Sequence, residues 1–315
     1  MAKIISSFVP ERIEHWADWI VAREAIRVKK ENQNQKPPYT LDAVMASTRW
    51  CNVRRMDDKV SKWMLENWFA KDGYSQARTA LVAGLLARMI NKPDTLSAIT
   101  GGKRFTKFDY DRAYKALYKI KDEGGTVFTN AYIINGASGG PKIDQVLNAI
   151  RDCHDACDAQ ATKFIVPESM QQTAAKISTL RGVGSFISGQ VVADLRHVLG
   201  DIDDGWWADR MTWAPPGPGS SRGMKYLLGL ASAEDMNGRG SDLREGQFLP
   251  ALRELVLLAQ QHKRVAPIFR DRKLEAHDIQ NTLCETSKYI RIKFGGGRGK
   301  NKYDAMGRYF EQLDL

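Results

Sequence analysis

The sequence predicts a mostly α-helical protein with few short strands, and three observations support this prediction. Apolar residues recur at helical spacing through residues 10–31, near the start of a 315-residue chain. The same pattern returns further along, at 79–90, 142–200, 224–232, 247–263 and 272–289. The best candidate for a strand is one short segment, Thr126–Thr129, which follows a Gly-Gly pair.

Local signals indicate where these helices begin and end. Residues 32–38, NQNQKPP, end the first helix, because proline and the residue before it disfavour helical geometry. Thr40 and then Asp42 can cap the next helix, and the helix over 79–90 stops at Asn91 and Pro93. Residues 201–224 are rich in Trp, Gly and Pro, so we expect a loop there.

Composition and charge narrow the class of protein. With 43% hydrophobic and 27% charged residues, the chain is typical of soluble globular proteins. Because no run of about eighteen apolar residues is present, neither a membrane span nor a membrane partner is expected, and the N-terminus does not resemble a signal peptide. Four cysteines favour a reducing cytosol over a disulfide framework. The net charge of +10 suits a polyanion such as nucleic acid, although charge alone leaves a basic protein without such a partner equally open.

The length suggests about two domains. We expect residues 1–142 to form an N-terminal helical part that includes the short strand segment. Residues 143–315 would hold a helix-hairpin-helix, the Gly/Pro loop and a basic C-terminal segment. The alternative is one integrated domain with the active site between these two parts.

The sharpest local pattern is LRGVG, Leu180–Gly184, which lies between two apolar-periodic helical segments. This is the helix-hairpin-helix pattern. Gly182 and Gly184 permit positive φ and remove Cβ atoms, so backbone N–H groups at a helix N-terminus can receive a DNA phosphate without reading a base. The alternative is a tight turn that only packs two helices, and the basic charge of the chain favours phosphate binding.

This segment resembles the helix-hairpin-helix DNA glycosylase superfamily, which implies a glycosylase-like helical fold and a base flipped out of the duplex. The nucleophilic lysine of bifunctional members is missing, since Phe186 occupies that region. The usual aspartate falls near Asp204, with Asp203 and Asp209 close by in sequence, and the C-terminal cysteines of an iron–sulfur cluster are absent. A lyase mechanism through lysine is therefore not expected.

Several segments together resemble a narrower family over about residues 20–305. In order along the chain, they are Arg23–Lys30 with Thr40–Asp42, Arg49–Asp58 leading to Trp63, Gly182–Phe186 with Asp194 and Leu195, Gly217–Gly223, and Leu283–Glu285 with Lys288 and Tyr289. These segments are similar to the bacteriophage amino acid:DNA transferases, also described as the helical domain of 5-hydroxymethyluracil DNA kinase proteins.

The resemblance implies a reaction on double-stranded phage DNA in the cytoplasm of the infected host. A separate kinase phosphorylates the hydroxymethyl group of 5-hydroxymethyluracil, and the transferase replaces that phosphate or pyrophosphate with the amine of a free amino acid. We expect glycine first, with serine, glutamate or a polyamine as alternatives. The kinase signature GxxxxGKS or GxxxxGKT is absent, so this chain would be the transfer half alone. No cofactor is certain, and assistance by Mg²⁺ stays open.

Two other functions stay open. One is a monofunctional DNA glycosylase for a modified base, which would share the hairpin and release a free base. The other is a DNA-binding module without enzymatic activity.

The leaving phosphate needs positive charge and aimed N–H groups. The residues that we expect to supply them, or to line the substrate pocket, are Arg49, Asn52, Arg54, Arg55, Gly219, Ser220, Ser221, Arg222, Lys288 and Tyr289. For Arg54 and Arg55 the alternative is ion pairing with Asp57 and Asp58, for the glycine segment a structural turn, and for Lys288 an i,i+3 ion pair with Glu285.

The incoming amine must be neutral, which requires a general base. We favour Asp194, which adjoins an apolar helix face and must therefore be paired or functional. The alternative is that Asp194 only orients an arginine. Asp209 is the second candidate and Asp204 the third, and Glu285 is also assigned a catalytic role.

No acid occurs between Thr286 and Tyr303. With Gly182 and Gly184, the cations of this stretch are the expected DNA contacts: Arg291, Lys293, Arg298, Lys300 and Lys302 around Gly295–Gly297. A solvated tail is the alternative. Lys103–Phe108 is a second basic and aromatic patch, and Trp206, Trp207 and Trp213 either stack on a flipped base or belong to the core.

Cys153 and Cys157 are spaced to share an ion on one helix, but Cys51 and Cys284 are isolated in the sequence. A four-ligand zinc site has no completion, so we expect no metal site.

Overall fold

The computed structural model describes residues 8–129, 140–199, 207–237 and 242–297. These residues form helices joined by irregular segments, without a β-strand, which confirms the mostly α prediction. The expected strand at Thr126–Thr129 was wrong. Within the described residues it has no partner strand to share a ladder. Instead, the ammonium of Lys92 donates to the carbonyl of Thr126 and, at 2.9 Å, to its hydroxyl.

The chain packs as two compact units. One unit comprises Met1–Asp57 and Met211–Leu315, and the other comprises Asp58–Arg210. The boundary expected after residue 142 falls inside the second unit. The division into domains made from the sequence stays a prediction.

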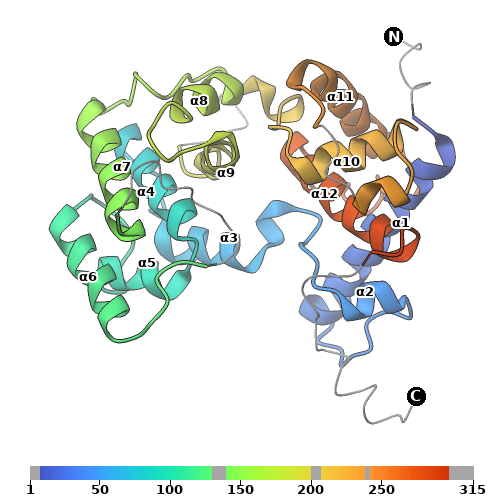
Figure 1. The fold of residues 1–315 in the computed structure, drawn as a ribbon, viewed down its shortest axis with the longest axis horizontal. Coiled ribbons are helices and arrows are strands. Elements are labelled where there is room, and N and C mark those ends of the chain that lie inside the picture. Colours follow the sequence, from blue (N-terminus) through green and yellow to red (C-terminus); the bar gives the residue numbers. More distant parts are fainter. Residues whose placement is uncertain (1–7, 130–139, 200–206, 238–241, 298–315) are drawn as a thin grey trace. The chain divides into compact units, whose positions relative to one another are not determined.

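The first unit is built around its C-terminal helix (Figure 1). Its elements are α1 (Pro10–Arg27), η2 (Val28–Asn32), α2 (Ala43–Ser47), η3 (Arg55–Asp57), α10 (Pro218–Leu227), η7 (Glu234–Asn237), α11 (Glu245–Gln261) and α12 (Ala276–Lys293). Helix α12 contacts α1, α2, η3, α10, α11 and η7. Its apolar residues Ile279, Leu283 and Ile290 are fully buried, so α12 forms the core on which the other elements pack.

The start of this unit follows the sequence prediction closely. The first helix and its π-helical extension end at Asn32, and irregular chain follows through the two prolines. Asp42 then caps α2, because its carboxylate accepts the backbone N–H groups of Val44 (2.9 Å) and Met45 (3.0 Å).

The loop expected over residues 201–224 was wrong in its last part. Helix α10 begins at Pro218, with Gly217 at the N-cap. Proline fits the first helical turn, where its missing N–H costs no hydrogen bond. The hydroxyl of Ser220 accepts the N–H of Gly217 at 2.9 Å, which closes the cap. The helix expected at 224–232 therefore starts earlier and ends at Leu227.

The second unit has α4 at its centre. Its elements are α3 (Lys59–Trp63), η4 (Met64–Trp68), α4 (Ala77–Ile90), α5 (Pro93–Thr100), α6 (Tyr110–Asp122), α7 (Lys142–Ala156), α8 (Met170–Ile177) and α9 (Ser185–Leu195), with η6 (Ala208–Met211) at its end. Helix α4 contacts η4, α5, α7 and α9. It stops as expected: Asn91 takes a left-handed conformation and Pro93 begins the next helix.

Among the described helices, none combines the length and the apolar character that a membrane crossing requires.

Candidate functional site

One face of α12 holds the arginine-rich segment Arg49–Arg55 along its backbone. Four polar side chains on this helix are spaced three or four residues apart and so project from one face. Two of them are acids that accept backbone N–H groups: Asp278 from Arg55 (2.8 Å) and Glu285 from Cys51 (3.1 Å). The other two donate to backbone carbonyls: Asn281 to Asn52 (2.9 Å) and Lys288 to Arg49 (2.9 Å). The segment is therefore fixed by its main chain.

Arg23 of α1 holds the same segment from another side. Its Nε donates to the Cys51 carbonyl at 2.9 Å, and its Nη2 donates to the side-chain oxygen of Asn52. The amide nitrogen of Asn52 in turn donates to the Asp57 carbonyl. Asn52 is buried, and burial lowers the pKa of Arg23. Asn52, which we expected to contact phosphate, is thus engaged inside the segment.

Glu285 and Lys288 form the i,i+3 ion pair that was one of the two sequence interpretations. Their charged atoms are 2.8 Å apart, and the ammonium also lies over the ring of Trp50 at 4.4 Å. Glu285 is buried, so both its hydrogen bond to Cys51 and its ion pair are made away from bulk water. The two residues hold the segment, and their contact with substrate stays a prediction.

The arginines of the segment differ in their surroundings. Arg54 pairs with Asp57 at 3.1 Å and lies over Phe269 at 5.5 Å, which matches the ion-pair alternative. Asp58 instead caps α3. Arg49 is exposed, and no ion pair of its side chain occurs within the described residues.

Helix α10 approaches α12 so closely that two glycines are required. A Cβ on Gly219 would lie 2.3 Å from Sγ of Cys284, and a Cβ on Gly223 would lie 2.2 Å from the Leu283 carbonyl oxygen. These glycines serve the packing of two helices, whereas the alternative raised for this segment was a structural turn. The close approach places Ser220, Ser221 and Arg222 beside α12.

Two of these residues have polar groups without partners in the described part of the chain. The hydroxyl of Ser221 is buried and unbonded there. Arg222 is half-buried and makes no ion pair there. Its positive charge and that of Lys288 lower the pKa of the Cys284 thiol, but burial outweighs them and raises this pKa to about 11.

We expect Cys284 to react slowly with iodoacetamide at pH 8, while the exposed Cys51 reacts at least about tenfold faster. The thiolate is the reactive form, and below its pKa its fraction rises about tenfold per pH unit. Labelling of Cys284 should therefore climb between pH 8 and pH 10. Peptide mass mapping measures each site, and Cys51→Ser serves as the control. Equal rates at pH 8 would contradict the raised pKa of the Cys284 thiol.

Asp42 gathers two further candidates at the end of α12. Its carboxylate accepts the hydroxyl of Tyr289 (2.6 Å) and the ammonium of Lys293 (2.8 Å). Burial acts to raise the pKa of Asp42, but these hydrogen bonds and the one from Met45 lower it overall. Arg291 is half-buried on the same helix. The first unit therefore brings together candidates from motifs far apart in the sequence.

The remaining candidates lie in the second unit. Asp194 of α9 is buried and forms a two-pronged ion pair with Arg88 of α4, with one bond of 2.6 Å. Arg88 also donates to Ser61 at 3.1 Å. This arrangement matches the interpretation in which Asp194 orients an arginine.

Asp209 acts as a cap for α8. Its carboxylate accepts the N–H groups of Met170 (2.9 Å) and Gln171 (3.1 Å) and the hydroxyl of Ser169 (3.0 Å). A carboxylate at a helix N-terminus is stabilised by the helix dipole and by free N–H groups. Its catalytic role stays a prediction.

The glycine turn between α8 and α9 differs in detail from the expectation. Gly182 has φ +79°, whereas Gly184 is the extended N-cap of α9 with φ −81°. A Cβ on either glycine would meet no atom within 4 Å, so both backbones face open space. The two helices pack on each other, and binding of DNA phosphate here stays a prediction.

Some candidates lie outside the described residues, namely Asp203, Asp204, Trp206, Arg298, Lys300 and Lys302. Trp207 and Trp213 belong to the core, with Trp213 donating to Glu245 at 2.9 Å. No group of three or more His, Cys, Asp or Glu that could hold a metal occurs in the described part of the chain.

Sequence reasoning missed three residues that organise these clusters. Arg88 is an arginine within the apolar helix α4, and that isolation was the available signal. Asp278 and Asn281 precede Glu285 and Lys288 at helical spacing, so the polar face of α12 was also visible in the sequence. The partner of this face, the Arg49–Arg55 segment, was not visible there.

Comparison with known proteins identifies the family. The model of the family described as 5-hmdU DNA kinase, helical domain, matches residues 11–298. The chain belongs to this family. The match confirms the resemblance expected from the sequence segments. A curated relative is the 5-hmdU DNA kinase of Bacillus phage SP10, which is 26% identical over 292 residues.

The alignment with this relative covers 86% of the chain but 44% of the phage protein. The chain thus spans less than half the length of the curated relative that it matches. No solved structure matches the chain significantly, so the expected likeness to helix-hairpin-helix glycosylases is not shown.

Proposed function

We propose that this protein acts on phage DNA that contains 5-hydroxymethyluracil, as a transferase that replaces the phosphate or pyrophosphate of the phosphorylated base with an amino acid, glycine first. The observation that carries the proposal is the family match over residues 11–298. The name of the phage relative supports a modified-DNA substrate. A separate kinase would supply that substrate, and the reaction would take place in the host cytoplasm.

The transfer step sets defined demands on the protein. The amine nitrogen attacks the methylene carbon, the carbon–oxygen bond breaks, and the phosphate leaves with the bonding electron pair. A base takes the proton that the amine loses. Cations must stabilise the leaving phosphate, and the absence of a carboxylate partner for Arg49 and Arg222 in the described chain suits this role.

For the base we now favour Glu285 over Asp194 and Asp209. Asp194 is committed to Arg88, and Asp209 is committed to the start of α8. Glu285 lies on α12 with the arginine segment on one side and Arg222 near the adjacent Cys284. Glu285 is itself paired with Lys288. In this proposal Lys288 would exchange that carboxylate for a phosphate, which would free Glu285 to act as the base.

The test is to incubate the protein with DNA containing phosphorylated 5-hydroxymethyluracil and single amino acids, then to digest the DNA and weigh the nucleosides. A new nucleoside whose mass equals thymidine plus the amino acid less two hydrogens is expected. Arg222→Ala should lower its yield by about tenfold or more, because one phosphate contact is lost. Arg272→Ala, which removes an exposed arginine, is the matched control. If no amine gives a new nucleoside, the proposal fails.

Two further arms separate the alternatives. Alkali-labile sites in treated DNA would indicate a glycosylase, which the family match does not favour. Transfer of labelled phosphate from ATP to 5-hydroxymethyluracil DNA is not expected, because the 315 residues lack the GxxxxGKS or GxxxxGKT signature. Loss of product in Arg222→Ala with DNA binding retained would eliminate a purely DNA-binding role.

A further inference from the structure

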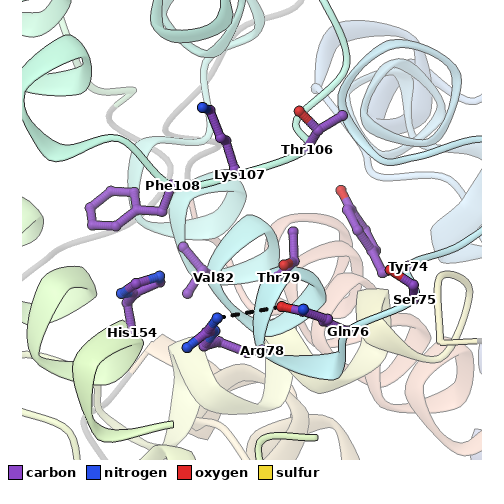
Figure 2. Close-up of a pocket in the computed structure, with 10 residues that line it drawn as sticks. All are labelled: Tyr74, Ser75, Gln76, Arg78, Thr79, Val82, Thr106, Lys107, Phe108 and His154. Atoms are coloured by element: carbon purple, nitrogen blue, oxygen red, sulfur yellow. Dashed lines mark hydrogen bonds between the residues drawn. The ribbon is translucent and has the colours of Figure 1, made fainter. Parts of the chain in front are cut away.

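A pocket with a volume of about 270 Å³ opens at the start of α4 in the second unit (Figure 2). Its lining comes from the segment before α4, the first turns of α4, the segment before α6, and α7: Tyr74, Ser75, Gln76, Arg78, Thr79, Val82, Thr106, Lys107, Phe108 and His154. This volume lies near the lower end of the range for small-ligand pockets, roughly 300–1,000 Å³. The space is suited to one small ligand.

The charge of this lining is positive. Arg78 and Lys107 are cationic, and none of the ten lining residues is acidic. Within the described residues, the guanidinium of Arg78 makes two long hydrogen bonds, both to neutral oxygens: the Cys157 carbonyl and the side chain of Gln76, each at 3.4 Å. Figure 2 shows Arg78 and Gln76 together at the start of the helix. Lys107 is exposed and forms no ion pair within the described residues.

Two acids that follow His154 in the chain, Asp155 and Asp158, form no ion pair with Arg78 within the described residues. Asp155 accepts a hydrogen bond from His154 at 2.9 Å, and its side chain is largely exposed. Asp158 accepts the N–H of Thr162 at 2.9 Å and also its hydroxyl. A ligand that carries negative charge would therefore meet Arg78 without displacing a carboxylate from it.

Aromatic rings form one wall and continue beyond it. The ring of Phe108 lies 5.6 Å from that of His154 and 6.5 Å from that of Tyr110. Arg151 lies over Tyr110 at 4.6 Å. Rings that alternate with cations are suited to single-stranded nucleic acid, in which unpaired bases stack on the rings and phosphates meet the cations.

We infer that this pocket binds a nucleotide, with its phosphate at Arg78 and Lys107 and its base against Phe108. The nucleotide is either free or part of an unpaired DNA strand that continues over Tyr110 and Arg151. The inference does not depend on the transfer reaction, because unmodified nucleotides meet the same chemistry.

The experiment measures binding of thymidine 5′-monophosphate and of a short oligothymidylate to the full chain by calorimetry. Lys107→Ala should weaken binding by about threefold or more, and Phe108→Ala by about fivefold or more. Lys119→Ala removes an exposed lysine of α6 that does not line the pocket, so it should leave binding within about twofold. Circular dichroism confirms that each variant is folded, and Lys107→Ala serves alone if Phe108→Ala is not.

The two ligands distinguish the sources. Binding of the mononucleotide that depends on Lys107 indicates a free nucleotide, and binding of the oligonucleotide alone with the same dependence indicates a strand. In the strand case, Arg151→Ala should also weaken the oligonucleotide. The inference is overturned if Lys107→Ala binds both ligands like Lys119→Ala, or if ribose 5-phosphate binds as tightly as the mononucleotide.

Discussion

Replacing Asp194 with alanine is expected to lower the free energy of unfolding by about 3–5 kcal/mol, because Arg88 would stay buried without its carboxylate. Both side chains are almost fully buried, with 3% and 4% of their surface exposed. Asp194→Asn should be destabilising too, since an amide leaves the arginine charge uncompensated. Urea unfolding of the full chain measures both changes.

A double variant tests the physical cause of this loss. Removing both charges, as Arg88→Met with Asp194→Leu, should recover much of the lost stability, because a buried ion pair can often be replaced by apolar side chains at little cost. Asp155→Ala, at an exposed acid, should change stability by less than about 1 kcal/mol. An Asp194→Asn protein that unfolds like the unmodified protein yet gives no transfer product would instead restore Asp194 as the base.

Gly223→Ala is expected to cost about 3 kcal/mol or more, because the new Cβ would lie 2.2 Å from the carbonyl oxygen of Leu283. Backbone cannot rotate away as a flexible side chain can, so α10 and α12 must separate. Gly246→Ala is the matched control, since a Cβ there meets nothing within 4 Å and lies inside α11. That change should stabilise the protein by about 0.5–1 kcal/mol.

Thermal or urea unfolding of the two alanine variants gives the comparison directly. If the glycines served mainly to let backbone approach a phosphate, Gly223→Ala would abolish transfer with little change in stability. That result would contradict the packing role that the distance between α10 and α12 assigns to Gly223.

Helix positions could be predicted wherever local signals agreed. The first helix, the cap at Asp42 and the stop before Pro93 all depend on residues within a few positions of each other, so the sequence contains what is needed. The segment Pro218–Leu227 was misjudged because its glycines and prolines suggested a loop. Proline at the first helical position and glycines at a close helix contact are compatible with a helix, but only the tertiary packing reveals this.

For some candidate residues the kind of contact could be expected from the sequence, but the partner could not. Asp194 was correctly expected to be paired or functional, because it adjoins an apolar helix face. Its partner Arg88 is 106 residues earlier in the chain, and no local pattern connects the two. Similarly, Glu285 and Lys288 were noted as a helical pair, but their bonds to the backbone of Arg49 and Cys51 depend on how distant segments fold together.

Helix α12 holds the Arg49–Arg55 segment by its main chain, so these contacts do not depend on the side chains at the positions that it holds. The helix binds main-chain atoms, and these are present whatever side chain each position carries. The side chains of Arg49 and Cys51 are exposed. Substitutions there can therefore change the contacts offered to a substrate while the backbone of the segment stays in place. If the proposed transfer site is correct, Arg49 and Cys51 are therefore the first two positions to vary in a search for a new specificity.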